Sequence, residues 1–272
     1  MPAINTNVAA LFAQQSLQVN ERSQSNAMRQ LSTGSRLNTA ADDAAGMAIG
    51  QNMTSQVRGL NQAVRNLNDG VNMMQTAEGA LGETSNMLQR MRELAVQSAN
   101  GTYSTTQRGY MQTEFAALSS QIGKIATDTK WNDQTVLSSS TTFTFLAGKD
   151  TGQTVAVVIG DMSLTGLAIP ATTTSIGTST SALTSLALLD AAIGTVNTQR
   201  STIGAGINQM TYAVDNLSNV AANVAASRST IVDTDYATAS TQLSKTQIIQ
   251  QAATAMLAQA NQQPQSVLAL LK

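Results

Sequence analysis

Residues 53–74 read MTSQVRGLNQAVRNLNDGVNMM, and their apolar residues recur at alternating steps of four and three. This spacing keeps them on one face of an α-helix, as in the seam of a coiled coil. The seam extends back to Ile49 and onward through Leu81, Leu88, Met91 and Ala95, with Glu78 as a polar interruption. We therefore predict one helix from about residue 44 to residue 99.

Two further stretches carry the same pattern. Ser104-x-x-Gln107 is a capping box in front of a seam that predicts a helix over 105–128. A third seam runs through residues 181–231, with Arg200 and Arg228 at two of its positions. We expect these arginines to pack their stems and turn their heads outward. Three seams predict a mainly α fold, built as a long antiparallel helical bundle or coiled coil.

The segment between the second and third seams has a different composition. Residues 142–146 and 154–159 are rich in β-branched and aromatic side chains, and residues 148–152 between them include two glycines. This pattern predicts a small β-hairpin. Residues 172–181 are rich in Ser, Thr and Gly, and we expect a linker that packs little.

The two ends of the chain have helical spacing but a thin apolar stripe. Residues 4–33 and 235–262 each bury little alone, so we expect the two helices to pack with each other and with further copies of the chain, and to become ordered on association; the resemblance given below implies that they pair as a coiled coil. Frayed tails are the alternative, although the spacing and the low charge density argue against it. The residues expected to drive self-assembly are Ile4, Val8, Leu11, Leu31, Leu243, Ile249, Ala253, Met256 and Ala260.

Composition excludes several kinds of function. The 272 residues carry a formal net charge of -1 and include neither cysteine nor histidine. The charge balance gives no electrostatic case for nucleic acid or a membrane surface as a partner. Without thiols and imidazoles, Cys/His metal sites and the usual base near neutral pH are missing. We therefore predict no enzyme, no cofactor and no metal.

The first twenty residues have no basic region, no continuous apolar stretch and no cleavage site. We predict that no signal peptide is cleaved, and that no window approaches the apolar run of a membrane helix.

Three blocks of sequence carry a family resemblance. They are STGSRLN at 32–38 with ADDAAG at 41–46, LQRMRELAVQSAN at 88–100, and DTDYA at 233–237 continuing to 261. In this order they resemble the terminal regions of bacterial flagellins. With the seams, the resemblance covers nearly all of residues 1–140 and 180–272.

The resemblance implies a self-assembling structural protein of the extracellular flagellum, secreted for motility. The expected partners are further copies of the chain, an export chaperone, and cap and junction proteins. Residues 1–43 would be an inner-core helix and spoke, and 232–272 the second inner-core helix. Residues 44–130 and 181–231 would form the outer shell, with the hairpin and linker at 131–180. Because flagellins usually insert outer domains there, this chain resembles a minimal form.

The resemblance also assigns roles to individual residues. The spoke that joins the two shells would use Gly34, Arg36, Asn38, Asp42, Asp43 and Gly46. For the two aspartates we favour a role at the helix N-terminus over a metal pair. A surface that packs on the next subunit, and that the flagellin-sensing Toll-like receptor of animal hosts binds, would comprise Arg90, Arg92, Glu93, Leu94, Gln97 and Glu114. Arg90 and Glu93 can form an i,i+3 ion pair.

Two other functions stay open. A hook–filament junction protein shares the terminal design but would not polymerise freely. A helical signalling hairpin of the chemoreceptor type would need a membrane segment or an input domain, and we find neither in the sequence.

Overall fold

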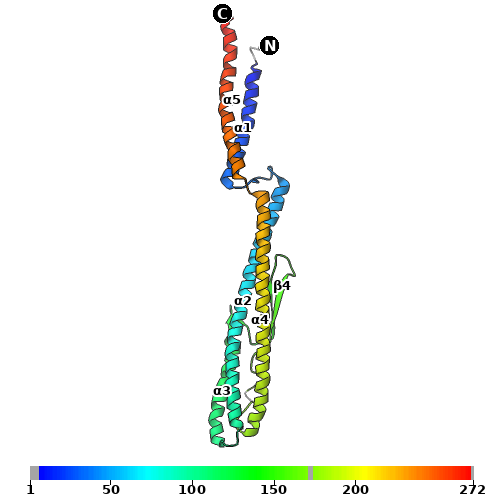
Figure 1. The fold of residues 1–272 in the computed structure, drawn as a ribbon, viewed down its shortest axis with the longest axis vertical. Coiled ribbons are helices and arrows are strands. Elements are labelled where there is room, and N and C mark those ends of the chain that lie inside the picture. The colour runs from blue at the N-terminus through cyan, green and yellow to red at the C-terminus, as the bar shows by residue number, and fades with distance from the viewer. Residues whose placement is uncertain (1–5, 171–173, 271–272) are drawn as a thin grey trace. The chain divides into compact units, whose positions relative to one another are not determined.

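The computed structural model describes residues 6–170 and 174–270, the side chains beyond Gln262 excepted. Within these ranges the elements follow in the order α1 (Val8–Thr33), α2 (Ala44–Ala99), α3 (Thr105–Asp128), β1 (Lys130–Trp131), β2 (Gln134–Thr135), β3 (Thr141–Leu146), β4 (Thr154–Ile159), α4 (Ser179–Val232) and α5 (Tyr236–Leu270) (Figure 1). The mainly α fold with a small antiparallel hairpin is confirmed. The chain divides into two compact units, residues 1–57 with 223–272, and residues 58–222.

In the first unit α1 and α5 lie side by side and run antiparallel (Figure 1). Asn7 Nδ2 donates to the carbonyl of Ala260 at 2.8 Å, and Asn20 Nδ2 donates to the carbonyl of Thr246, also at 2.8 Å. The start of α1 thus contacts the C-terminal part of α5, and the middle of α1 contacts a point nearer the start of α5, as in an antiparallel pair. The predicted pairing of the terminal helices is confirmed.

Local signals fix the ends of these helices. Asn7 caps α1, with its Oδ1 accepting from the Ala10 N–H, so the helix begins at Val8 rather than near residue 4. Gly34 ends α1 in the left-handed conformation, at φ 69°, where a residue without Cβ is favoured. Asp235 caps α5 by accepting from the N–H groups of Ala237 and Thr238.

In the second unit the three seams meet in one core. α2 and α3 have the bounds expected from the sequence, and their seam residues are buried together with those of α4. Figure 1 shows α3 beside α2, and the β3–β4 hairpin alongside α4. The largest fully buried side chains of α2 and α3 are Leu67, Met74, Leu81, Leu88, Met91, Leu94, Phe115 and Ile122.

The polar interruptions of two seams contact each other in this core. Arg200 Nε on α4 donates to Glu78 Oε1 on α2 at 2.8 Å. The Arg200 head therefore turns toward Glu78 of α2, while its side chain stays 40% exposed. Arg228 differs from expectation: its Nε is buried, with no hydrogen-bond partner in the described part of the chain.

The hairpin pairs Phe143 with Val157 and Phe145 with Val155, and the inward side chains of β4 are buried. α4 allows this close approach at Gly206, where a Cβ would lie 2.7 Å from Val157 Cγ2. A second, two-residue hairpin, β1–β2, was not anticipated. Its turn places Asn132 and Asp133 at positive φ, as a type I′ turn requires.

The expectation of a loosely packed linker is wrong for residues 174–178. Ile176 is fully buried, and its N–H donates to Gln112 Oε1 on α3 at 2.6 Å. The Ser98 hydroxyl of α2 donates to the Ile176 carbonyl. Distant helices supply these partners, which composition alone does not reveal.

By length and composition alone, α4 could cross a membrane, since an 18-residue window has a mean hydropathy of 1.3. The prediction that no window approaches such a run was therefore wrong. The core helix of a soluble protein passes the same test, and Leu189, Val196 and Ile203 of α4 belong to the core of the second unit. These core contacts account for part of its apolar composition, since 28% of the window is buried.

Candidate assembly and recognition surfaces

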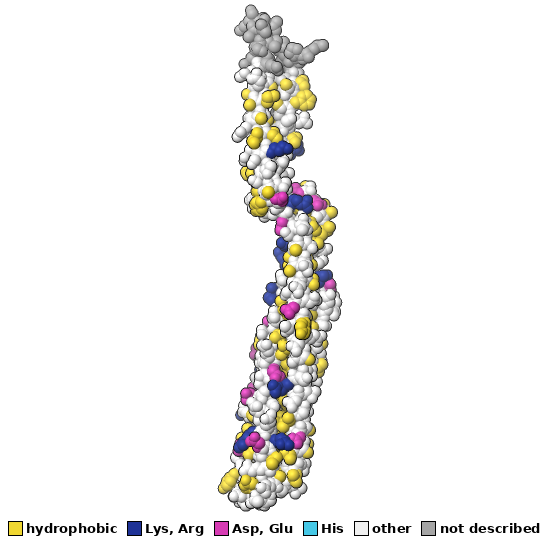
Figure 2. Space-filling model, in the orientation of Figure 1, with side chains coloured by type: hydrophobic (Ala, Val, Ile, Leu, Met, Phe, Trp, Pro, Cys, Tyr) yellow, Lys and Arg dark blue, Asp and Glu magenta, His cyan; other side chains and the backbone are white. Residues whose placement is uncertain are grey.

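The α1–α5 pair leaves large apolar side chains uncovered. Val8 is 52% exposed, Leu11 57%, Ile249 41% and Met256 67%. Four more exposed apolar residues had not been singled out from the sequence; they are Phe12, Val19, Met28 and Ile248. Figure 2 shows apolar side chains at the visible surface of both helices.

The contact between α1 and α5 uses small and polar residues. The buried residues of the two helices are Asn20 and Ala27 of α1, and Ala239 and Thr246 of α5. Of the other predicted assembly residues, Leu31, Leu243, Ala253 and Ala260 are half-buried, and Ile4 lies outside the described residues. Because small residues fill the contact, the larger side chains are directed elsewhere.

The predicted spoke residues lie together in the first unit, against the turn between α4 and α5. The Arg36 N–H donates to the Val232 carbonyl at 2.7 Å, and its guanidinium donates to the Ile231 carbonyl at 2.8 Å. The Gly34 carbonyl accepts from the Thr234 N–H at 3.0 Å. Asn38 Nδ2 closes the loop by donating to the Ser35 carbonyl. The predicted spoke residues thus form a hydrogen-bonded connection between segments almost 200 residues apart.

Asp42 and Asp43 bind backbone N–H groups. Asp42 Oδ2 accepts from the N–H groups of Asn38 and Thr39 and from the Thr39 hydroxyl. The hydrogen bond from the Thr39 backbone, followed by that from its hydroxyl, lowers the pKa of Asp42 below its usual value. Asp43 Oδ1 accepts from the Gly46 N–H at the start of α2. The described residues contain no group of three acidic, Cys or His side chains that could hold a metal.

Gly46 is buried at this first turn of α2, where a Cβ would lie 2.9 Å from Leu37 Cδ1. The spoke loop therefore packs directly on the helix backbone.

In the second unit, α2 and α3 present a charged surface. Arg90 is 2.9 Å from Glu93 on its own helix and 2.9 Å from Glu114 on α3. The hydrogen bond with Glu114, and next that with Glu93, raises the pKa of Arg90 above its usual value. Arg92 pairs instead with Asp190 of α4.

Two other residues predicted for this surface have different surroundings. Gln97 is exposed, and its Nε2 donates to the Tyr103 hydroxyl at 3.1 Å. Leu94 is only 2% exposed and belongs to the core of the second unit. Its inclusion in an exposed surface is therefore corrected, because it lies on the inward face of α2.

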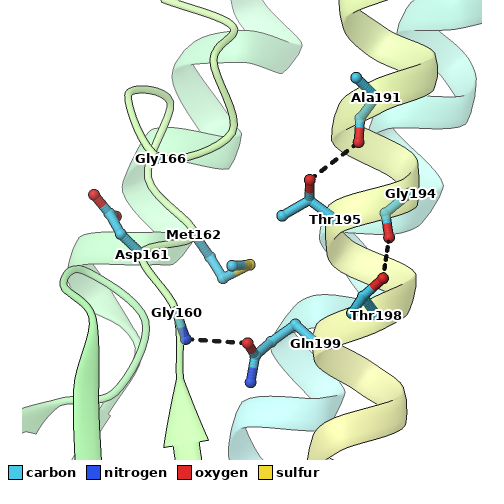
Figure 3. A pocket seen from close by; sticks show the side chains of 9 residues that line it. All are labelled: Gly160, Asp161, Met162, Gly166, Ala191, Gly194, Thr195, Thr198 and Gln199. Carbon is cyan, nitrogen blue, oxygen red and sulfur yellow. Dashed lines mark hydrogen bonds between the residues drawn. The ribbon is translucent and has the colours of Figure 1, made fainter.

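A shallow pocket of about 650 Å³ lies between the loop after β4 and α4 (Figure 3). The hydroxyls of Thr195 and Thr198 on its wall donate to carbonyls of their own helix. Gln199 spans its base, with Oε1 accepting from Gly160 N–H at 3.0 Å and Nε2 donating to a carbonyl of β4. These polar groups already have partners inside the protein, so the pocket offers little to hold a ligand.

The paired terminal helices and the three-helix core define a structural protein made of long helices. Two family models match it: the bacterial flagellin N-terminal helical region over residues 4–142, and the bacterial flagellin C-terminal helical region over residues 186–271. The chain is 39% identical over 270 residues to a flagellin of Halalkalibacterium halodurans, with 99% of each covered. This chain belongs to the bacterial flagellin family.

Other relatives are either similar to this chain in length or longer. The flagellar filament 33 kDa core protein of Treponema phagedenis is 38% identical over 284 residues, with 99% of both chains covered. Flagellin B of Vibrio anguillarum is 33% identical, but its alignment spans 374 positions against the 272 residues of this chain. The chain is thus shorter than some members of its family.

Solved structures show the same fold. The crystal structure of Bacillus cereus flagellin matches with a TM-score of 0.51 and 30% identity, over 56% of this chain and 88% of that one. A putative flagellar hook-associated protein from Vibrio parahaemolyticus matches with a TM-score of 0.58 over 70% of this chain and 99% of that one. At 16% identity, this second match concerns the fold alone.

Proposed function

We propose that the chain is the structural subunit of a flagellar filament, which it forms outside the cell by self-assembly. The observation that carries the proposal is the row of exposed apolar side chains on α1 and α5. A helix pair with so few buried residues leaves most of its apolar surface to be covered by further copies.

The energetic argument is simple. Complete burial of a Val, Leu, Ile, Phe or Met side chain stabilises a protein by about 1.5–3 kcal/mol. Each of the eight exposed residues is about half exposed, so about half of this stabilisation can still be gained at each when a neighbour covers it. Coverage by neighbours would then contribute on the order of 6–12 kcal/mol per subunit. The free chain cannot obtain this stabilisation, so ordering of the terminal helices is coupled to assembly.

Charge does not oppose the approach of further copies. The net charge is -1, so identical subunits repel each other weakly. Export of the chain with the help of a chaperone, followed by addition beneath a cap and onto junction proteins, is part of the same proposal. The ends of the chain would line the filament, and the second unit would form its wall.

A matched pair of substitutions tests the assembly surface. Val8→Thr and Val158→Thr make the same near-isosteric change at sites that are 52% and 50% exposed, one on α1 and one on the outer face of β4. We expect Val8→Thr to raise the critical concentration for seeded polymerisation several-fold, and Val158→Thr to leave it near the parent value. Equal effects at the two sites would remove α1 as the assembly surface.

The same assay separates a filament subunit from a junction protein. Filaments that lengthen continuously from seeds as monomer is added support the filament subunit. Addition that stops after a short cap at the seed end would favour the junction protein.

We further propose that the surface formed by Arg90, Glu93, Gln97 and Glu114 contacts the neighbouring subunit in the filament and binds the Toll-like receptor as free monomer. Its support is geometric, since ion pairs hold exposed side chains of two helices in one arrangement. Arg90→Asp should weaken receptor signalling at least about tenfold, because it replaces a bidentate cation with a like charge beside two carboxylates. Arg65→Asp, on the same helix and outside any ion pair of the described residues, is the control. Unchanged signalling by Arg90→Asp would refute the proposal.

A further inference from the structure

The turn between α2 and α3 holds the one Asn-Gly pair of the sequence, Asn100-Gly101. Both residues are exposed. The function proposed above makes no use of them, and their geometry favours a chemical reaction of the asparagine side chain.

The Asn100 carboxamide is folded back onto the chain. Its Oδ1 accepts a hydrogen bond from the Thr102 N–H at 3.2 Å, which forms an Asx turn. The ring that this hydrogen bond closes contains both the Asn100 side-chain carbonyl carbon and the Gly101 nitrogen. An N–H that donates to a carbonyl oxygen also stabilises negative charge that develops there during nucleophilic attack.

The Gly101 nitrogen is free to act as the nucleophile. Its N–H donates to no described residue, whereas the Asn100 N–H is held by the Gln97 carbonyl. Gly101 has no side chain, and apart from its two chain neighbours no atom lies within 4 Å of the position that a Cβ would take. Residue 101 therefore adds no side-chain hindrance to the attack, and no more distant segment crowds it.

We propose that Asn100 is a site of spontaneous deamidation. The Gly101 nitrogen gives its proton to solvent and attacks Asn100 Cγ, so that an N–Cγ bond forms. The Cγ–Nδ2 bond then breaks, and the leaving group takes up a proton and departs as ammonia. Water opens the resulting five-membered imide at either carbonyl, which leaves aspartate or isoaspartate at position 100. No electron transfer is involved, and water is the only co-reactant.

The product changes the contacts of the turn. The Asn100 carbonyl accepts from Arg108 Nη2 at 3.0 Å and from the Tyr103 N–H at 3.5 Å. Isoaspartate adds a methylene to the main chain at this point and displaces that carbonyl. Tyr103 also holds the Gln97 side chain, so the change reaches the surface of α2.

Asn197 lacks this arrangement and serves as the comparison. Asn197 is exposed too, but it lies inside α4 and is followed by Thr198, whose amide belongs to the helix. A helical backbone holds the following nitrogen away from the carboxamide, and misplacement by about 1 Å can cost on the order of 100-fold in rate.

The test is to age the purified full-length chain in mildly alkaline buffer and follow each asparagine by peptide mapping and mass spectrometry. We expect the replacement of NH2 by OH at Asn100 to proceed on the order of 100-fold faster than at Asn197. Gly101→Ala should slow it by a similar factor, because the new methyl group hinders the attacking nitrogen. The glycine has an ordinary φ and open space around it, so the fold should tolerate this change.

A synthetic peptide of residues 97–105 separates sequence from fold. If Asn100 deamidates in the folded chain at least as fast as in the peptide, the result supports a role for the turn geometry. An Asn100 that stays intact in the folded chain after the peptide has converted would overturn the proposal. In converted protein, faster hydrogen exchange at the amides of Tyr103 and Arg108 should accompany isoaspartate, and unchanged exchange would refute the proposed effect on the turn.

Discussion

The two units are built from helices of the same kind, yet they use apolar residues in opposite ways. In the second unit the seams of α2, α3 and α4 face one another and bury leucine, isoleucine, methionine and phenylalanine. In the first unit α1 and α5 meet through alanine, asparagine and threonine, and leave their larger apolar residues outside. Helical spacing alone therefore does not determine burial; the residues that face the partner helix do.

The difference is visible along one helix. Leu60, Leu67 and Leu81 of α2 lie in the second unit and are buried, whereas Ile49, near the start of the same helix, is exposed in the first unit. The apolar stripe continues across this boundary at helical spacing, with steps of three or four residues. What changes is the number of neighbouring helices that can cover the stripe.

The largest expected effect comes from replacing one leucine in each unit, which tests the contrast between a packed core and an exposed stripe. Leu81→Ala should reduce the free energy of unfolding of the second unit by about 2–5 kcal/mol, since it leaves a cavity in a packed core. Leu11→Ala should cost the free first unit less than about 1 kcal/mol, because more than half of its side chain is already in water. Native-state hydrogen exchange measures the free energy of unfolding of each unit separately. A similar loss in both would contradict the contrast.

Glycine replacements give a smaller effect, of opposite sign in the two units. Gly34→Ala should destabilise the first unit by about 1–2 kcal/mol, because its φ of 69° is strained for any residue with a Cβ. Gly79→Ala should stabilise the second unit by about 0.5–1 kcal/mol, since this glycine lies inside α2 with open space around it. Urea denaturation of each variant checks the two signs. Stabilisation by Gly34→Ala would show that the left-handed cap does not matter.

The smallest effect concerns pH. Asp42 and Asp235, both in the first unit, have pKa values below the usual one of 3.8 because backbone and hydroxyl groups donate to their carboxylates. A lowered pKa in the folded state stabilises above the ordinary pKa, and this contribution is lost as the pH falls through the folded value. Below about pH 4 the first unit should loosen before the second. Asp42→Asn with Asp235→Asn should remove this difference in hydrogen exchange, and persistence of the difference would assign it to other groups.

Regular periodicity was the most informative part of the sequence. It predicted the bounds of α2 and α3, whereas composition predicted the β3–β4 hairpin and the family resemblance implied the pairing of α1 with α5. Contacts between distant segments were not predictable in this way. The Glu78–Arg200 pair needs the register of two helices, and the burial of Ile176 depends on side chains from α2 and α3.

Some of what was missed had a signal. Asn7 and Asp235 are capping residues in sequence, and their recognition would have placed the starts of α1 and α5. Leu94 lies within the periodicity of α2, three residues after Met91, so its burial could have been predicted. The roles of the remaining surface residues in assembly and recognition stay predictions.

The hydrogen bond between Asn20 and Thr246 joins positions 226 residues apart. A ribosome that has just made α1 must therefore synthesise nearly the whole polypeptide before its partner exists. The entropic cost of closing so long a loop grows only slowly with its length. The time needed to synthesise the intervening residues nevertheless delays the pairing of the two helices. The middle of the chain can fold while synthesis continues, whereas the terminal pair forms only in a polypeptide that has been completed. The α1–α5 contact thus forms only after α5 has been synthesised, and a chain truncated before α5 would leave α1 without this partner.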